Sequence, residues 1–282
     1  MTQCASGPAA KATKSTESAK ATKATKATYV FAVARTLDPA VVADLGGMTD
    51  GEPVRVLPLG SLTAVVQSVP AHDFTDDAWQ KRLSDPQDLE RCARSHHEVV
   101  SASAAHGPAV PLPLATLYFS DARARQALED EADRFHAVLR RIAHHAEWGV
   151  KVYGPPASPP DDVDRPAPAA DRGRPAPGAG LAYLERKRGL QQRREQHHER
   201  SLRIAEEVDA ELGKLATAAR RLRPHGHRPS DARGSQLLNA TYLVAEHRAH
   251  EFAELTRALR GRTGARIEIS GPWVPYSFVG EV

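Results

Sequence analysis

Between residues 29 and 119, the apolar residues change their spacing in an order that few folds can accommodate. Apolar residues that alternate with polar ones, as in strands, give way to apolar residues three and four apart, as in helices. The order is strand, helix, strand, strand, helix, strand, which is typical of a ferredoxin-like βαββαβ domain. We therefore predict such a domain at 29–119. The expected segments are strands at 29–35, 53–59, 61–69 and 108–119, and helices from Asp38 to Gly46 and from Asp85 to Gly107.

A second region of mixed pattern follows, and we predict that residues 120–282 form an α+β domain with a long helix and a small sheet. Apolar residues at helical spacing mark its helices, and these should cover the sheet. Residues 154–179 are rich in Pro, Ala, Gly and Asp, so we expect a flexible loop there. The other expected segments are helices at 121–146, 181–222 and 246–261, strands at 147–153, 237–245 and 266–270, and a loop at 224–234.

The long helix expected at 181–222 has two unlike halves. Residues 185–200 are polar nearly all round, and such a helix cannot be buried, so it must project, bridge or meet a partner. The later half has an apolar stripe that should pack on the sheet. The stripe consists of Ile204, Val208, Leu212, Leu215, Ala219 and Leu222.

The basic charge of the chain is concentrated before residue 29. The formal net charge is +3, whereas residues 1–28 alone hold five lysines and one acid, which leaves the remainder close to neutral. No aromatic residue accompanies the lysines, so we expect a disordered, solvated tail and no nucleic-acid partner. The tail has no apolar run typical of a secretion signal, and no later run is long enough to cross a bilayer. With only Cys4 and Cys92, no disulfide framework is indicated, and we expect a cytoplasmic protein with no membrane partner.

The sequence offers little support for catalysis or metal binding. Its 13 histidines are scattered along the chain, some of them in adjacent pairs, and only His247 and His250 have a spacing that could chelate an ion. Neither HExxH nor CxxC occurs, and phosphate-binding glycine loops and GxSxG are also missing. We therefore predict no enzyme, no catalytic residue, no metal and no cofactor.

His96 is the histidine that leaves an alternative open. It lies on the apolar face of the helix from Asp85 to Gly107, where a core histidine with one hydrogen bond is the favoured interpretation. The rival hypothesis is a histidine-dependent metal or small-molecule enzyme centred near His96. A bound metal or a deep pocket around this residue would favour that rival.

The segment GPWVPYSF (271–278) combines two stiffening prolines with three large aromatic residues, Trp273, Tyr276 and Phe278. One interpretation is that these side chains hold the last strand on the core. The other is that they form an exposed docking edge, since aromatic clusters also make binding hot spots. We predict Trp273, Tyr276 and Phe278 as partner-binding residues and leave the first interpretation open.

Seven strings of residues, in order along the chain, resemble the GvpF/GvpL gas vesicle protein family. The most specific of them are EWGVKV, AYLERK and GPWVPYSF. The motif residues are His96, Glu147, Trp148, Lys151, Tyr183, Lys187, Gly271 and Pro272. The strings are YVFAV (29–33), HHEVV (96–100), VPLPLATLYF (110–119), EWGVKV (147–152), GLAYLERK (180–187), ATYLV (240–244) and GPWVPYSF (271–278).

This resemblance implies a protein without enzymatic activity that is required to build gas vesicles, the gas-filled protein shells that give cells buoyancy. Its implied partners are the major shell protein and other gas vesicle accessory proteins. The implied role is that of an assembly factor or a minor component associated with the shell, in the cytoplasm.

The chain departs from the family pattern at two points. Leu114-Ala115-Thr116 stands where the family usually has Phe-Gly-Thr, and the loss of this glycine predicts a less tight turn. Val274 stands where a proline is common, which is a mild change. Neither the lysine-rich tail nor the length of the 154–179 loop belongs to the resemblance.

Overall fold

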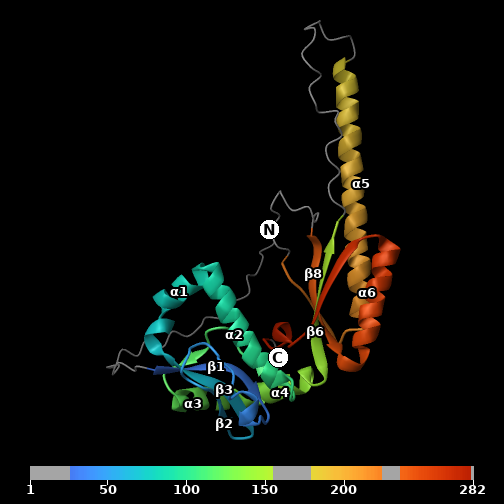
Figure 1. Ribbon diagram of the computed structural model, residues 1–282. Coiled ribbons are helices and arrows are strands. Elements are labelled where there is room, and N and C mark those ends of the chain that lie inside the picture. Colours follow the sequence, from blue (N-terminus) through green and yellow to red (C-terminus); the bar gives the residue numbers. More distant parts are fainter. Residues whose placement is uncertain (1–25, 155–178, 224–235, 281–282) are drawn as a thin grey trace, which may run out of the picture.

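Figure 1 shows the computed structural model, which describes residues 26–154, 179–223 and 236–280. Two antiparallel sheets with attached helices lie side by side, and the long helix α5 extends well beyond the second sheet (Figure 1). The predicted α+β class is therefore confirmed. In the described ranges, no helix has both the length and the apolar character needed to span a bilayer.

The first sheet has the order β2-β3-β1-β4, with neighbouring strands antiparallel and the short β5 also paired with β1. The central strand β1 is almost wholly buried, in keeping with its β-branched and aromatic residues. Gly60, with φ of 59°, closes the tight turn between β2 and β3. The strands are β1 (Lys26–Ala34), β2 (Val54–Leu59), β3 (Leu62–Pro70), β4 (Ala109–Pro111) and β5 (Leu117–Tyr118).

Helices cover both faces of this sheet. On one face lies α2 (Pro86–Ala104), which begins where the Asp85 carboxylate accepts hydrogen bonds from two backbone N–H groups of its first turn. The short α1 (Asp76–Ser84) precedes it. On the other face lie α3 (Asp121–Glu129) and α4 (Ala132–Ile142), whose apolar residues join those of the sheet in one core.

The strand order agrees with a ferredoxin-like sheet, but one helix of that arrangement is missing. The connection between β1 and β2 contains only a three-residue 3-10 helix (Pro39–Val41), where we predicted a helix from Asp38 to Gly46. Gly47 follows with φ of 64°, a backbone conformation that ends a helix. The ferredoxin-like assignment thus stays a prediction.

The predicted helix at 121–146 is wrong in two respects. It is two helices, α3 and α4, and its last residues instead start strand β6. Both helices pack on the first sheet, where Asp121 accepts hydrogen bonds from Thr28 and Arg55 at 2.8 Å each. These bonds, with Arg55 contributing most, hold the pKa of Asp121 below its usual value. The division at 119 and 120 is untested as a domain boundary, but the packing favours one after Ile142.

The second sheet has the order β7-β8-β6-β9, again antiparallel. Helices α5 (Ala179–Gly213) and α6 (Ala249–Thr263) lie together on one of its faces, and α6 ends at Gly264 in the left-handed conformation that glycine favours (Figure 1). The strands are β6 (His145–Tyr153), β7 (Ala218–Arg221), β8 (Gln236–Ala245) and β9 (Arg266–Trp273).

Helix α5 is shorter than predicted. It ends at Gly213 rather than at Leu222, because Ala218 to Arg221 pair with β8 as an edge strand. Ala219 and Leu222 therefore do not belong to the apolar stripe of the helix, whereas Val208 and Leu212 do and are fully buried. The polar half of the helix projects, as its composition predicted.

Several predicted segments fall wholly or largely outside the described residues. They are most of the tail at 1–28, most of the loop at 154–179 and the whole of the loop at 224–234. Lys26 to Thr28 are described, and they form the start of β1 rather than the end of a tail.

Candidate functional site

A groove of about 690 Å³ lies between the two halves of the molecule. One wall is the end of α2, with His97, Ser101 and Ala104. The opposite wall is the segment that follows β9, including Trp273 and Val274. Ile142, from the first core, lies between the walls, so both halves must be folded for the groove to exist.

The wall formed by residues 271–278 is held in place by the buried carboxylate of Glu147, at the start of β6. Its two oxygens accept hydrogen bonds from the backbone N–H of Ser277 at 2.8 Å and from the Ser277 hydroxyl at 2.5 Å. Arg220 of β7 donates to the Ser277 carbonyl at 3.0 Å. Phe278 is only 5% exposed and anchors the segment to the body. This set of contacts fixes the segment without using Trp273 or Tyr276.

Trp273 and Tyr276 remain open to solvent, at 48% and 36% exposure. Both rings contact His97 of α2, with ring centroids 5.8 and 5.9 Å apart, and the Tyr276 hydroxyl lies 3.3 Å from His97 Nδ1. Partial burial raises the pKa of Tyr276, so this phenol stays protonated at neutral pH. The two interpretations of the aromatic segment thus apply to different residues: Phe278 is core, and Trp273 and Tyr276 are exposed.

Gly271 and Pro272 lie where β9 passes close to β6. Gly271 has φ of 125°, and a Cβ there would come within 2.8 Å of the Glu147 carbonyl oxygen. The register between β6 and β9 shifts at this point, between Glu147 and Gly149, and the Gly271–Pro272 bond is cis. A residue other than glycine would therefore displace the groove wall.

The other motif residues are not gathered at the groove. Trp148 packs against Phe252 of α6, with ring centroids 5.9 Å apart, on the opposite face of the second sheet. Lys151 lies further along β6, paired with β8 and β9. Lys187 is exposed on the projecting part of α5, and the side chain of Tyr183 lies outside the described residues.

His96 is a core histidine. It is 4% exposed, between the rings of Tyr29 and Phe31. The Tyr29 hydroxyl accepts the N–H of Ala115 at 3.2 Å and lies 2.9 Å from His96 Nδ1, so its own proton is available for that nitrogen. Burial lowers the pKa of His96 to about 4, so the ring is neutral at pH 7. His96 thus forms a buried hydrogen-bonded contact between β1 and α2. This geometry gives the hypothesis of an enzyme centred near His96 no support.

Ala115 keeps the tight turn that the loss of glycine was expected to loosen. Its φ is 68°, in the left-handed region, and Thr116 N–H donates to the Pro113 carbonyl at 3.2 Å. The bond from Ala115 to Tyr29 requires this conformation, because it aims the amide at the buried hydroxyl. The turn is therefore maintained with an alanine in a position that favours glycine.

Three residues important to this region were missed by the sequence analysis. His97 follows the singled-out His96, but on a helix it points about 100° away, which placed it off the apolar face. Ser277 lies inside the aromatic segment and was overlooked because its role depends on a partner 130 residues away. Tyr29 was predicted only as an apolar residue of the first strand, and nothing in the sequence indicated its contact with His96.

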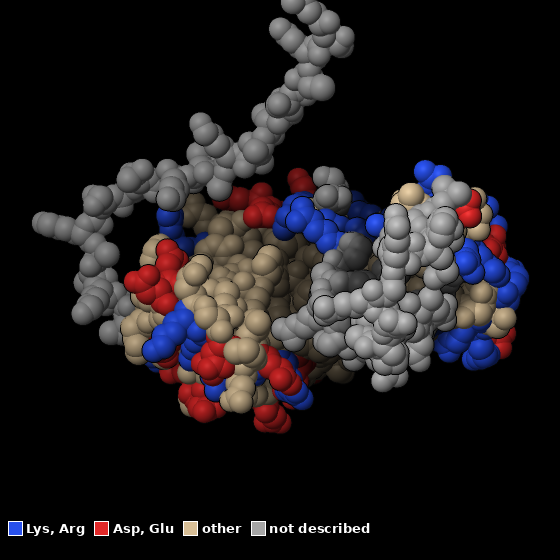
Figure 2. Space-filling view, turned by 90° about the horizontal axis from the view of Figure 1, so that it is seen from above, with Lys and Arg blue, Asp and Glu red and all other residues tan. Residues whose placement is uncertain are grey.

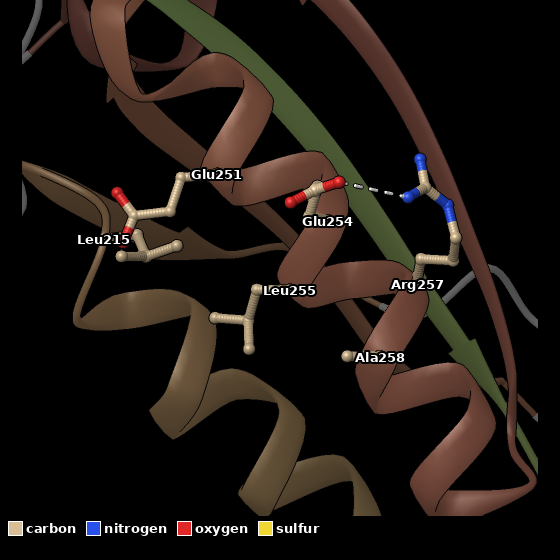
Figure 3. Close-up of a pocket in the computed structure, with 6 residues that line it drawn as sticks. All are labelled: Leu215, Glu251, Glu254, Leu255, Arg257 and Ala258. Carbon is tan, nitrogen blue, oxygen red and sulfur yellow. Dashed lines mark ion pairs between the residues drawn. The ribbon is translucent and has the colours of Figure 1, made fainter.

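A second groove, of about 560 Å³, lies between α5 and α6 (Figure 3). Figure 3 shows Glu254 directed toward Arg257, at 3.6 Å, while Glu251 pairs with Arg248 at 3.0 Å. Both carboxylates of this second groove are therefore paired with arginines, and Leu215 and Leu255 supply its apolar surface. Among all the described residues, no three or more His, Cys, Asp or Glu side chains are grouped so as to hold a metal ion.

These features define an α+β protein with two antiparallel sheets and an aromatic-walled groove between its halves. The chain belongs to the family of gas vesicle synthesis protein GvpL/GvpF, whose model matches residues 27–280. The family expected from the sequence motifs is thereby confirmed, and with it a role related to gas vesicles.

Known proteins agree with this assignment. The chain is 37% identical over 252 residues to gas vesicle protein L of Streptomyces sp. (strain CB03234), covering 89% of this chain and 92% of that protein. Two crystal structures share the fold at 16% identity. GvpF from Anabaena sp. PCC7120 gives a TM-score of 0.61, over 91% of this chain and 97% of that one. GvpF from Microcystis aeruginosa gives 0.62, over 90% and 99%.

Proposed function

We propose that the protein is an accessory factor required for gas vesicle formation, which works by binding the major shell protein rather than by catalysis. It acts in the cytoplasm, associated with gas vesicles, as an assembly factor or a minor shell component, alongside other accessory proteins. Family membership supports the gas vesicle role. The observation that carries the binding site is Trp273, a large apolar side chain left half-exposed on a wall fixed by other residues.

The groove has the character of a site for an apolar protein segment. Trp273, Val274 and Pro275 offer apolar surface on one wall, and Ala104 at the end of α2 and Ala105 after it add to the apolar lining. Tryptophan and tyrosine beside a preformed depression are typical of binding hot spots. A shell subunit with exposed apolar surface would aggregate before assembly, and occupation of this groove would cover part of that surface.

The test is co-expression with the major shell protein from the same genome, followed by affinity capture of the folded complex. We expect Trp273→Ala to reduce retention of the shell protein at least about tenfold, since hot-spot truncation costs about 2 kcal/mol or more. Phe119→Ala is the matched control, because Phe119 is 83% exposed and lies outside the groove.

Circular dichroism of both variants should match the original chain, because neither side chain is buried. Equal retention by the Trp273→Ala variant would refute the groove as the binding site. Lack of retention by the unaltered chain, with the fold intact, would refute the shell protein as its direct partner.

A further inference from the structure

The projecting half of α5 is a helix with no core of its own. All side chains described between Leu184 and Arg200 are exposed, whereas from Ser201 onward one face of the helix is buried, with Ala205, Val208 and Leu212 on it. Its side-chain hydrogen bonds include two that stay inside the helix, from Gln191 to Glu195 and from Arg193 to the Gly189 carbonyl. A helix of this kind gains little stability from packing. It therefore depends on side-chain pairs within the helix, or on a partner, to stay helical.

The charges of this half are sorted by face. Residues 185–200 contain six basic and three acidic residues. Arg193 and Arg200 are seven residues apart, which places them within about 20° of one another around the helix. The glutamates at 185, 195 and 199 lie about 110° away on average. We call Arg193 and Arg200, with Leu190 beside them, the arginine face.

Figure 2 views the molecule from above, the end from which α5 projects in Figure 1. The half that carries α5 shows more blue than red toward the viewer, whereas the two colours are mixed over the other half (Figure 2). Arg193 and Arg200 are both exposed, and nothing in the fold described here requires their charge. The arginine face is thus a basic surface that packing in the protein leaves unused.

We propose that the arginine face docks an acidic α-helix of a partner protein. Its two charges lie about 10 Å apart along the helix axis, which is the rise of seven residues, and carboxylates at seven-residue intervals on a second helix match that spacing. Arginine forms bidentate hydrogen bonds with carboxylates, and it is enriched at protein interfaces. Leu190 adds an apolar contact beside Arg193. This surface is separate from the groove at Trp273, so the inference goes beyond the proposed function.

A nucleic acid or a membrane fits this surface less well. A helix that lies on a membrane needs a broad apolar face, and Leu190 is the one leucine on the arginine face. Proteins that bind single-stranded nucleic acids stack the bases on aromatic side chains, and residues 185–200 contain no Phe, Tyr or Trp.

The test uses the full chain and a labelled helical peptide of about three heptads with glutamate at every seventh position. Fluorescence anisotropy at low salt should show binding that a peptide with glutamine at those positions lacks. Arg193→Gln with Arg200→Gln should weaken binding about tenfold or more, while preserving helix propensity. Arg91→Gln with Arg94→Gln, which removes two exposed arginines of α2, should leave binding unchanged.

Each other result counts against the proposal. Equal affinity of the chain for the glutamate and glutamine peptides would show that charge does not drive the binding. Equal affinity of the two double variants for the glutamate peptide would show that the arginine face is not the site. Tighter binding of duplex DNA or of vesicles rich in phosphatidylserine, weakened by the same α5 substitutions, would overturn it in favour of those partners. Circular dichroism of the α5 double variant must match that of the original chain, and an unaltered, folded chain that binds neither peptide would refute the site.

Discussion

At the scale of single residues, the first half of the molecule is organised around one buried hydrogen-bonded set. Tyr29 of β1 links His96 of α2 to the amide of Ala115, and burial strongly raises the pKa of its phenol. The set pairs the Tyr29 hydroxyl with His96 Nδ1 in the core, where an unpaired polar group costs about 1–3 kcal/mol. Two predictions follow from the states of His96 and Ala115.

Acid should destabilise the protein through His96. Its folded pKa is about 4, below the ordinary value of 6.5, so the unfolded chain binds the proton first. Stability is therefore fully present above about pH 6.5 and is lost progressively as pH falls toward 4, by on the order of 3 kcal/mol. Urea unfolding between pH 7 and 4.5 measures this loss. A His96→Gln variant should show a shallower pH dependence, and an unchanged slope would contradict the assignment.

Glycine at position 115 should stabilise the protein. Ala115 has φ of 68°, a conformation that costs a non-glycine residue about 1–2 kcal/mol, of which the greater chain entropy of glycine offsets part. We expect Ala115→Gly to raise the free energy of unfolding by about 0.5–1 kcal/mol. Ala102→Gly, inside helix α2, is the control and should lower it by a similar amount. A loss of stability in both variants would show that Ala115 is unstrained.

At the scale of elements, the decisive contact is the one between the start of β6 and the segment after β9. Glu147 uses both carboxylate oxygens on Ser277, so the groove wall depends on an acceptor from a strand far away in the chain. The same wall gains Phe278 as a buried anchor. Because Glu147, Ser277 and Phe278 hold the wall in place, the side chain of Trp273 stays half-exposed.

Glu147→Gln should loosen that wall. The amide oxygen can accept from the Ser277 N–H and the amide NH₂ can donate to the Ser277 hydroxyl, but both bonds lose the strength that the carboxylate charge gives them. We expect a loss of about 1–2 kcal/mol in the free energy of unfolding, measured with urea. Glu254→Gln, at an exposed ion pair, should cost less than about 0.5 kcal/mol. Equal losses in the two variants would mean that the Glu147 contacts add no more to stability than an exposed ion pair does.

The sequence predicted elements best where local chemistry decides them. Asp85-Pro86 marked the start of α2, and Gly60 marked the turn between β2 and β3. It failed where a tertiary contact decides. The edge strand β7 has no alternation, being Ala-Ala-Arg-Arg, and exists because β8 offers it a partner. For the site, Trp273 and Tyr276 were identified by residue type, but His97 and Ser277 depend on packing between distant segments.

At the scale of the whole molecule, the segment after β9 joins the two halves, because its Val274 and Val279 pack against the core of the first half. His97 of the first half touches Trp273 and Tyr276 of the second, beside the groove. An occupant of the groove would therefore contact both halves at once and stabilise their mutual orientation. The projecting half of α5 lies away from this junction, so the molecule offers two surfaces for two different contacts (Figure 1).

The bond between Glu147 and Ser277 also has a consequence for the order of events during synthesis. The two residues are 130 positions apart, and β8 and β9 are made between them. The buried residues of the first core all lie between Val30 and Ile142, and the partly buried Val279 joins them from the second half, so most of this core can form while the ribosome is still making the second half. The groove wall closes only after Phe278 has emerged. A nascent chain therefore acquires most of its first core well before its groove, and an incomplete chain presents no finished groove to a partner.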